Sequence, residues 1–341
     1  MSETAGTARE HSEDVPNIEV DLQATDNDSS YGQEFSTYSA SLTSSVLDYR
    51  NENGRRYHGY RDGRYLIPND EEESDRLDMI HEMMLETMNR KLFLAPIGSS
   101  PQRVLDIGTG TGIWVMDFAD QFQSAEVYGI DLSPTQPTFV PPNVKFIVDD
   151  FEDEWVYENQ QGFDFIHARY LAGSVKDFPR LLKQAYKWTA PGGWVEFQDW
   201  DTNMYSEDGS TKGTSIEQYY RATIDGFTNA GYVASPGPRL EQWFREAGFQ
   251  DIHVQKYRIP IGAWPKDKYY KTLGTWNLLQ AETGFEAAAL AVLTRHEKWS
   301  PEEVNVLVAK TRSDVRNPNI HPLFDFYVVY GRKPENSGTR A

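Results

Sequence analysis

A carboxylate followed by three glycines at alternate positions constrains the fold of this chain more than any other feature. The run Asp106-Ile107-Gly108-Thr109-Gly110-Thr111-Gly112 ends an apolar segment, residues 103–107 (RVLDI), and precedes a segment of helical pattern. A buried strand that leads through a glycine turn into a helix is typical of parallel α/β sheets, which bind ligands at the carboxyl ends of their strands. The glycines let the backbone turn tightly and lie close to a bulky ligand. We therefore expect an α/β fold with a ligand site at this turn.

Strands and helices are expected to alternate beyond the turn. The expected strands cover residues 103–107, 126–131, 144–148, 163–167, 194–198, 252–259 and 324–330. The expected helices cover residues 113–122, 178–188, 215–229 and 238–247. Strands that alternate with helices form a parallel sheet with right-handed crossovers. Residues 264–322, which join the last two strands, are expected to form a helical insertion that lies at the surface and covers the pocket.

Three regions are expected along the chain. Residues 1–45 are rich in Ser, Thr, Asp and Glu and hold few aliphatic residues, so we expect a disordered acidic tail. Residues 46–100 form a cap region, whose helix begins after Asn69 or Asp70. Residues 101–335 form the main domain. The cap helix carries an apolar stripe that is expected to pack over an edge of the sheet: Leu77, Ile80, Met84 and Met88.

The composition excludes several classes of function. The 341 residues carry a formal charge of −19, which repels a phosphate backbone, and the basic cluster of Arg55, Arg56, Arg61 and Arg64 is too short for a basic arm, so nucleic-acid binding is not expected. No cysteine is present, which excludes disulfides, thiolate zinc sites and iron–sulfur clusters, and we expect no metal site. No apolar stretch approaches the ~20 residues of a membrane span. A cytoplasmic location is expected, with a nuclear one as the alternative.

Acidic residues at two further strand ends predict the type of ligand. Asp131 lies 19 residues after Gly112 and is placed to accept the hydroxyls of a ribose. Asp149-Asp150-Phe151 follows the third strand, where a carboxylate and a ring can hold an adenine. Position 113 is isoleucine, so the turn departs from the G-x-G-x-x-G of dinucleotide sites. The pattern favours a nucleoside with an ammonium group, held by Asp106, over a nicotinamide or flavin cofactor or a ligand-free turn.

The sequence from about Asn51 to the last expected strand resembles the fungal LaeA-like methyltransferases, within the class I S-adenosylmethionine-dependent superfamily. The glycine turn is common to the whole superfamily, whereas the acidic helix with LAPI and the IHAR segment are far more specific. The resemblance is carried by the motifs NGRRY, DEEESDRLDMIH, LAPI, VLDIGTGTGIW, YGIDLSPTQP, PPNVKF, DDFEDEW, FDFIHAR, PGGWVE and AGFQDI.

The resemblance implies a Rossmann-like sheet of seven strands with an antiparallel last strand, and S-adenosyl-L-methionine as the cofactor. It implies an enzyme that methylates a small molecule of fungal secondary metabolism. The alternative is a nuclear regulator of secondary-metabolite genes that binds the cofactor and velvet-type partners. The implied cofactor contacts are Asp106, Gly108, Gly110, Gly112, Asp131, Asp150 and Phe151. Neighbouring positions complete the expected contacts: Thr109, Leu132, Asp149 and the backbone of His167.

His167 is the candidate catalytic base, needed only if the acceptor must lose a proton, because it ends the fourth strand beside the expected methionine end of the cofactor. The competing interpretation is a structural histidine. Arg169 is expected either to hold an anionic acceptor or to pair with a carboxylate. Six aromatic residues are expected to line an apolar acceptor pocket, with core packing as the alternative: Tyr57, Tyr60, Trp264, Tyr269, Tyr270 and Trp276.

Overall fold

The computed structural model describes residues 49–157 and 162–335. The expected acidic tail, residues 1–45, lies outside the described residues. A short antiparallel hairpin opens the described part and pairs β1 (Arg50–Glu52) with β2 (Arg55–Tyr57). The sequence did not predict this hairpin, since its strands have only three residues each and carry no clear alternation of polar and apolar side chains.

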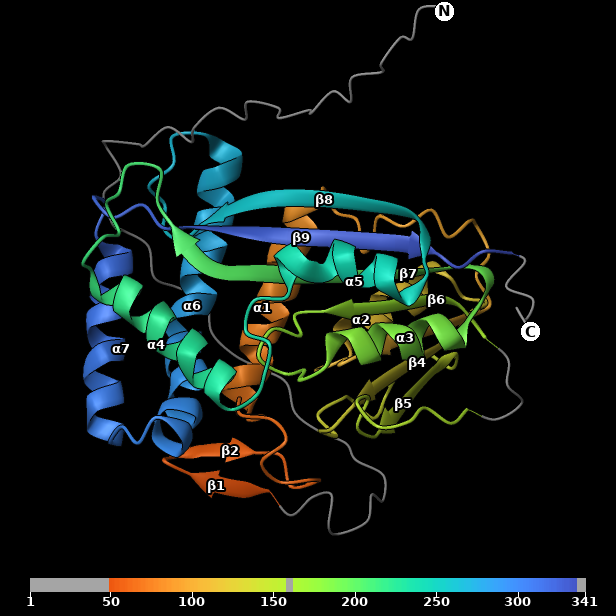
Figure 1. Ribbon diagram of the computed structural model, residues 1–341, viewed down its shortest axis with the longest axis horizontal. Helices are drawn as coiled ribbons and strands as arrows, with labels where there is room; N and C mark the ends of the chain where they lie inside the picture. The colour runs from red at the N-terminus through yellow and green to blue at the C-terminus, as the bar shows by residue number, and fades with distance from the viewer. Residues whose placement is uncertain (1–48, 158–161, 336–341) are drawn as a thin grey trace, which may run out of the picture.

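A seven-stranded sheet forms the centre of the molecule, in the order β5-β4-β3-β6-β7-β9-β8 (Figure 1). The strands are β3 (Arg103–Ile107), β4 (Glu126–Asp131), β5 (Val144–Val148), β6 (Phe163–Arg169), β7 (Thr189–Tyr205), β8 (Gln250–Pro260) and β9 (Leu323–Arg332). The pairs from β5 to β7 are parallel, whereas β9 runs antiparallel to both β7 and β8. The predicted sheet with its antiparallel last strand is therefore confirmed. β7 is longer than the expected 194–198, because β6 and β9 pair with it on both sides.

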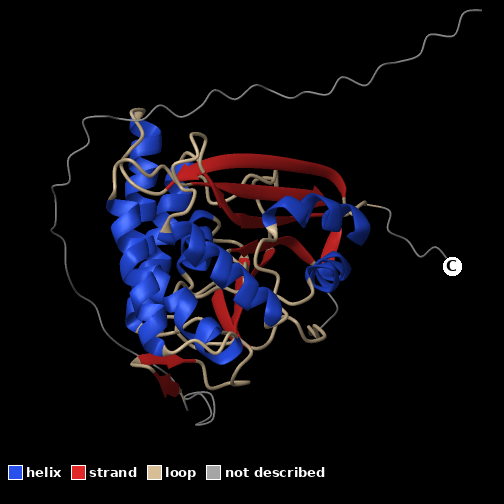
Figure 2. Ribbon diagram, turned by 60° about the vertical axis from the view of Figure 1, so that its left-hand side comes forward, coloured by secondary structure: helices blue, strands red, loops and turns tan. Residues whose placement is uncertain are grey.

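Helices cover the sheet and extend beyond one side of it, as Figure 2 shows. They are α1 (Glu71–Thr87), α2 (Ile113–Gln121), α3 (Phe178–Trp188), α4 (Ser215–Asn229), α5 (Leu240–Ala247), α6 (Lys268–His296) and α7 (Pro301–Arg316). A 3₁₀ turn, Gly237–Arg239, precedes α5. The connection between β8 and β9 contains α6 and α7, which pack with α4 beside the sheet (Figure 1).

Asp70 caps the start of helix α1, and its carboxylate accepts a hydrogen bond from the amide of Glu73. Its apolar residues Ile80 and Met84 belong to one core cluster with Phe285 of α6. The expectation that α1 covers a sheet edge is wrong, because its apolar stripe packs chiefly along α6. Its other side contributes Leu85 to a cluster around β3 and α2. This position places the first half of α1 over the carboxyl ends of the central strands.

Candidate functional site

A cavity of about 1040 Å³, counted out to its open mouth, lies at the carboxyl ends of β3, β4 and β6. We call it the glycine-turn cavity. The segment from Tyr65 to Ile80, which leads into and includes the start of α1, forms another wall. The cavity is bordered by eight of the residues expected from the sequence: Asp106, Gly108, Thr109, Gly110, Asp131, Leu132, Phe151 and His167. Gly112, Asp149 and Asp150 do not border it.

At two of the glycines, neighbouring side chains leave no room for a larger residue. Gly108 has φ +68°, and a Cβ there would lie 2.6 Å from the side chain of Leu171, so any larger residue would distort the turn. Gly112, which caps α2, has φ +80° and would place a Cβ 2.4 Å from the ring of Phe146. Gly108 therefore shapes the cavity wall, whereas the structure gives Gly112 a role in packing α2 against β5.

The carboxylate of Asp131 lies at the end of β4 and is held by two backbone amides. One oxygen accepts from Gly110 N at 2.9 Å and the other from Ser133 N at 2.9 Å. Burial raises the pKa of Asp131 to about 6, against the lowering effect of these hydrogen bonds. An ionised carboxylate has about four lone-pair sites, so the two amides leave room for further donors from a ligand.

His167 is completely buried between Asp106 and Trp114. Its Nδ1 lies 2.7 Å from Asp106 Oδ1, and its ring stacks on the Trp114 indole at 3.9 Å between ring centroids with an interplanar angle of 1°. Burial lowers the pKa of His167 although Asp106 opposes the shift, so the imidazole is neutral at pH 7. A neutral ring that donates from Nδ1 to the carboxylate has an acceptor at Nε2. Nε2 has no hydrogen-bond partner among the described residues.

Arg169 turns a guanidinium toward the same cavity. Its Nη2 donates to Nδ1 of His81 at 2.8 Å, and His81 Nε2 donates to Asp117 at 2.9 Å. Burial lowers the pKa of Arg169 to about 10, so the group keeps its charge at neutral pH. The direct carboxylate partner that the sequence suggested is replaced by a histidine. Arg169 Nη1 is buried without a partner among the described residues, which leaves a donor for an anionic group.

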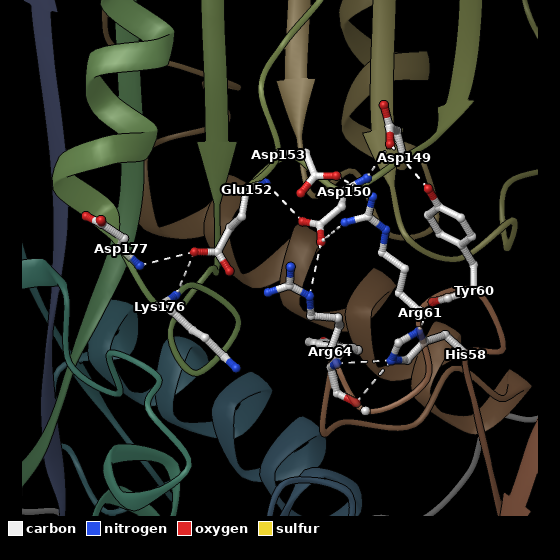
Figure 3. A network of polar contacts seen from close by, with 12 residues as sticks. His58, Tyr60, Arg61, Arg64, Asp149, Asp150, Glu152, Asp153, Lys176 and Asp177 are labelled. Carbon is white, nitrogen blue, oxygen red and sulfur yellow. Dashed lines mark hydrogen bonds and ion pairs between the residues drawn. The ribbon is translucent and has the colours of Figure 1, made fainter.

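Asp149 and Asp150 contact the N-terminal segment instead of the cavity (Figure 3). Asp150 Oδ2 lies 3.0 Å from Arg61 Nη1 and 3.4 Å from Arg64 Nε, and Tyr60 donates its hydroxyl to Asp149 at 3.5 Å. The expected contact of these carboxylates with an adenine stays a prediction. Phe151, the next residue, does border the cavity. The arginines thus hold the turn that carries this ring.

The four arginines of the basic cluster all pair with acidic residues of the protein itself. Arg55 forms a bidentate pair with Asp70, at 2.7 and 2.8 Å, and Arg56 contacts Glu71 at 2.9 Å. Arg61 and Arg64 contact Asp150, as described above. Each of the four arginines of the cluster therefore has an acidic partner within the protein.

A second cavity of about 690 Å³, counted to its mouth, adjoins the first and lies between α4, α6 and the loop after β6. We call it the α4–α6 cavity. Tyr170 borders both cavities. The other aromatic side chains around the second cavity come from α4 and α6: Tyr219, Tyr220, Phe227 and Phe285. Sequence reasoning missed these four residues, because helical spacing alone does not distinguish a cavity wall from a filled core.

The six aromatic residues that the sequence suggested for an acceptor pocket border neither cavity, so that expectation is wrong. Tyr57 is buried beneath the Arg295 guanidinium, 4.7 Å from its ring centroid. Trp264 is buried near His321. The Tyr269 hydroxyl donates to the carbonyl of Thr87 at 2.9 Å and fastens the start of α6 to the end of α1. Core packing and element anchoring account for these side chains.

Across residues 49–157 and 162–335, no group of three His, Asp or Glu side chains is placed to hold a metal ion. Over the same ranges, no helix has the length and apolarity needed to cross a membrane.

A Rossmann-like sheet in this strand order, with a glycine turn after β3 and a carboxylate at the end of β4, defines a class I S-adenosylmethionine-dependent methyltransferase. The chain belongs to the methyltransferase-domain family, which matches residues 79–254. Methyltransferase pytC of Aspergillus terreus is 43% identical over 332 residues, which cover 96% of this chain and 99% of that protein. The secondary metabolism regulator LAE1 of Cochliobolus heterostrophus is 36% identical over 291 residues, which cover 83% of this chain and 94% of that protein.

The glycine-turn cavity fits S-adenosylmethionine in shape and in polarity. Three buried polar atoms without a partner among the described residues belong to side chains on its wall: Thr109 Oγ1, His167 Nε2 and Arg169 Nη1. Buried polar groups ordinarily have partners, so these atoms mark where a polar ligand belongs.

Proposed function

We propose that this methyltransferase acts on a small molecule of secondary metabolism. The observation that carries the proposal is the wall of the glycine-turn cavity: residues between Tyr65 and Ile80 border it in addition to the strand ends. A cavity walled by both segments suits a small molecule better than the surface of a polymer. The relative pytC, which the chain matches over nearly its whole length, is named as a methyltransferase.

Four side chains are proposed to hold the cofactor. Asp131 accepts the ribose hydroxyls with its remaining lone pairs, and Phe151 packs at the adenine end. Asp106 binds the ammonium group, and Arg169 Nη1 donates to the carboxylate of the methionine part. Bound S-adenosylmethionine supplies an electrophilic methyl: an acceptor electron pair bonds to its carbon, the sulfur–methyl bond breaks, and S-adenosylhomocysteine leaves. The enzyme chiefly has to position the acceptor and exclude water.

His167 keeps its proposed role as the base for a hydroxyl acceptor, and its geometry adds a second role. The 2.7 Å contact with Asp106 orients the carboxylate that is proposed to bind the ammonium group. Nε2, the lone-pair nitrogen, is the atom that would take a proton.

The test is transfer of a radioactive methyl group from S-adenosylmethionine by the purified protein. The protein is mixed with a metabolite extract from a fungal strain that lacks its gene, and the extract is separated into small-molecule and protein fractions. We expect label in the small-molecule fraction. Label confined to the protein fraction would contradict the proposal.

The alternative is a nuclear regulator that works with velvet-type partners, and its support is the similarity to LAE1. We propose a cytoplasmic location for the enzyme, which separates the two functions. A fluorescent fusion concentrated in the nucleus, together with co-purification of a velvet-type protein, would favour the regulator.

A further inference from the structure

The α4–α6 cavity adjoins the glycine-turn cavity along two stretches of chain, in which neighbouring residues border different cavities. Pro68 borders the glycine-turn cavity and Ile67 the α4–α6 cavity, and Leu171 and Ala172 are divided in the same way. Tyr170 borders both. A molecule in the α4–α6 cavity therefore lies against the same wall as the bound cofactor.

The backbone of Tyr170 is held in an unfavourable conformation. Its φ of +61° lies in the left-handed region, which a bulky aromatic residue rarely adopts. Hydrogen bonds on each side hold it there: Tyr170 N donates to Gln198 O at 2.9 Å, and Leu171 N donates to the Asp199 carboxylate at 2.8 Å. Strain maintained in this way is concentrated at binding and catalytic sites. Here its effect is to fix the tyrosine between the two cavities.

The Tyr170 hydroxyl is tied to a buried ion pair. Arg76 Nη1 donates to the hydroxyl at 3.3 Å and to Gln280 Oε1 at 2.9 Å, while Arg76 Nε donates to Glu73 at 2.8 Å. Both members of the pair are buried, at 3% and 1% exposure, so their charges are neutralised locally. Because the hydroxyl accepts from Arg76, it can donate its own hydrogen to a molecule in the cavity.

The remaining wall combines aromatic rings from α4 and α6 with a group of very small residues on α6. Aromatic side chains come mainly from α4, and α6 contributes Ala281, Gly284 and Ala288, which share one helix face. At Gly284 a Cβ would lie 3.1 Å from Arg76 Cδ, so the glycine lets the guanidinium cross the helix. Aromatic rings beside these small side chains suit a flat molecule. The cancelled charge of the Glu73–Arg76 pair leaves nothing to attract a net charge.

We propose that the α4–α6 cavity binds the methyl acceptor, and that this acceptor is an uncharged, flat and mostly apolar molecule with an oxygen that accepts a hydrogen bond from Tyr170. The inference rests on the proposed small-molecule function and adds to it the place and chemical class of the acceptor. Tyr170 is a positioning residue between acceptor and cofactor.

The first experiment fills the cavity from α6. The probe is 2-naphthol, a flat neutral molecule with one hydroxyl, titrated by calorimetry into protein saturated with S-adenosylhomocysteine. Ala288→Phe should weaken 2-naphthol binding at least ~10-fold, because the new ring occupies the space, and should leave the affinity for S-adenosylhomocysteine unchanged. Leu279→Phe, on the same helix but 50% exposed and outside the cavity, is the matched control and should bind both normally. Equal binding of 2-naphthol by wild type and Ala288→Phe would overturn the proposal.

The second experiment removes only the hydroxyl. Tyr170→Phe should lower the affinity for 2-naphthol ~3–10-fold, the usual value of one hydrogen bond, and should not change the affinity for naphthalene. Wild type should bind 2-naphthoate, the charged analogue, more weakly than 2-naphthol. Tighter binding of the carboxylate, or equal effects of Tyr170→Phe on both neutral probes, would contradict the assigned acceptor class.

The labelled-methyl assay then separates failure of this inference from failure of the proposed function. If wild type and Ala288→Phe label the small-molecule fraction equally, the acceptor lies elsewhere and the proposed function stands. If wild type binds 2-naphthol in the cavity but labels only protein, the proposed function fails, and with it the assignment of the cavity to an acceptor. Loss of label in Ala288→Phe, with normal label in Leu279→Phe, is the expected result.

Discussion

The Asp131 side chain has two roles: it holds the glycine turn, and it borders the cavity in which the cofactor is proposed to bind. Its carboxylate holds the amides of Gly110 and Ser133, at 2.9 Å each, and faces the cavity. Asp131→Ala should weaken S-adenosylhomocysteine binding by roughly 10–150-fold, from the loss of one or two charged hydrogen bonds. Calorimetry measures the change. An unaltered affinity would place the ribose elsewhere.

The same residue predicts a pH dependence of cofactor binding. Burial raises the pKa of Asp131 to about 6, so the carboxylate that accepts ribose hydroxyls is lost as the pH falls below that value. One unit below the pKa about a tenth remains ionised, and S-adenosylhomocysteine should bind roughly tenfold more weakly at pH 5 than at pH 7. Asp131→Asn should show weaker binding with a flatter profile. An identical slope in the variant would assign the dependence to another group.

Arg169 offers a sharper test, because ligands with and without a carboxylate can be compared. Arg169→Met should weaken S-adenosylhomocysteine binding by roughly 10–150-fold, the value of a charge-assisted hydrogen bond. The affinity for 5′-methylthioadenosine, which lacks the carboxylate, should stay within about twofold. Equal losses for both ligands would indicate that the variant, which also removes the contact with His81, has disturbed the cavity as a whole.

For His167 the catalytic and positioning roles can be distinguished by measuring kcat at saturating cofactor. His167→Ala should weaken cofactor binding by a few-fold, because Asp106 loses its 2.7 Å partner. If the imidazole is also the base, kcat at saturation should fall ~10²–10⁴-fold, and the loss should shrink at high pH as the acceptor ionises unaided. A kcat that recovers fully at saturation would leave His167 with the positioning role alone.

At the scale of elements, the segment between β2 and α1 is fastened to the turn after β5. Arg61 and Arg64 contact Asp150, and Arg61 also pairs with Asp153 (Figure 3). Phe151, which belongs to this turn, borders the glycine-turn cavity. The double variant Arg61→Ala/Arg64→Ala should weaken cofactor binding several-fold, most clearly at low salt. Arg90→Ala, which breaks an exposed pair with Glu82, is the control and should have no effect.

The same scale shows what the sequence could predict. Residues 103–112 and Asp131 were placed correctly, because a strand, a glycine turn and a strand end are set by local pattern. The LAPI motif belongs to the family resemblance, but the sequence does not show why it is needed. In the structure the amides of Leu94 and Ala95 donate to Glu196, about one hundred residues away in the chain. The left-handed backbone of Tyr170 and the cavity between α4 and α6 depend on packing between distant elements, for which the sequence gives no periodic signal.

For the whole molecule, buried carboxyl groups predict a stability that falls as the pH rises. Burial raises the pKa of Glu196 and of Asp199 to about 7 each, above the ~4 of an unfolded chain. The folded state therefore binds these protons more tightly, and the free energy of unfolding decreases between about pH 4 and pH 7. Glu196→Gln keeps an oxygen for the two amides, and its amide nitrogen replaces the oxygen that accepts from Gln198 Nε2 at 2.7 Å. The Gln198 amide then has to turn, so that Oε1, which has no partner among the described residues, accepts from it. In this variant the free energy of unfolding, measured by thermal melting, should decrease less between pH 5 and pH 8 than in wild type. The difference should be on the order of 1 kcal/mol. An unchanged slope would contradict the role of Glu196.

Tyr170 also marks the position in the sequence that separates most residues of the glycine-turn cavity from most residues of the α4–α6 cavity. Every residue that borders the cofactor side lies at or before Ser174, and every residue that borders the α4–α6 cavity, except Ile67 and Arg76, lies at or after Tyr170. A crossover between two related genes near this codon would exchange α4 and α6 as a unit and leave the glycine turn, Asp131 and Phe151 intact. Descendants of such an event would inherit a new acceptor preference without having to evolve the cofactor half again.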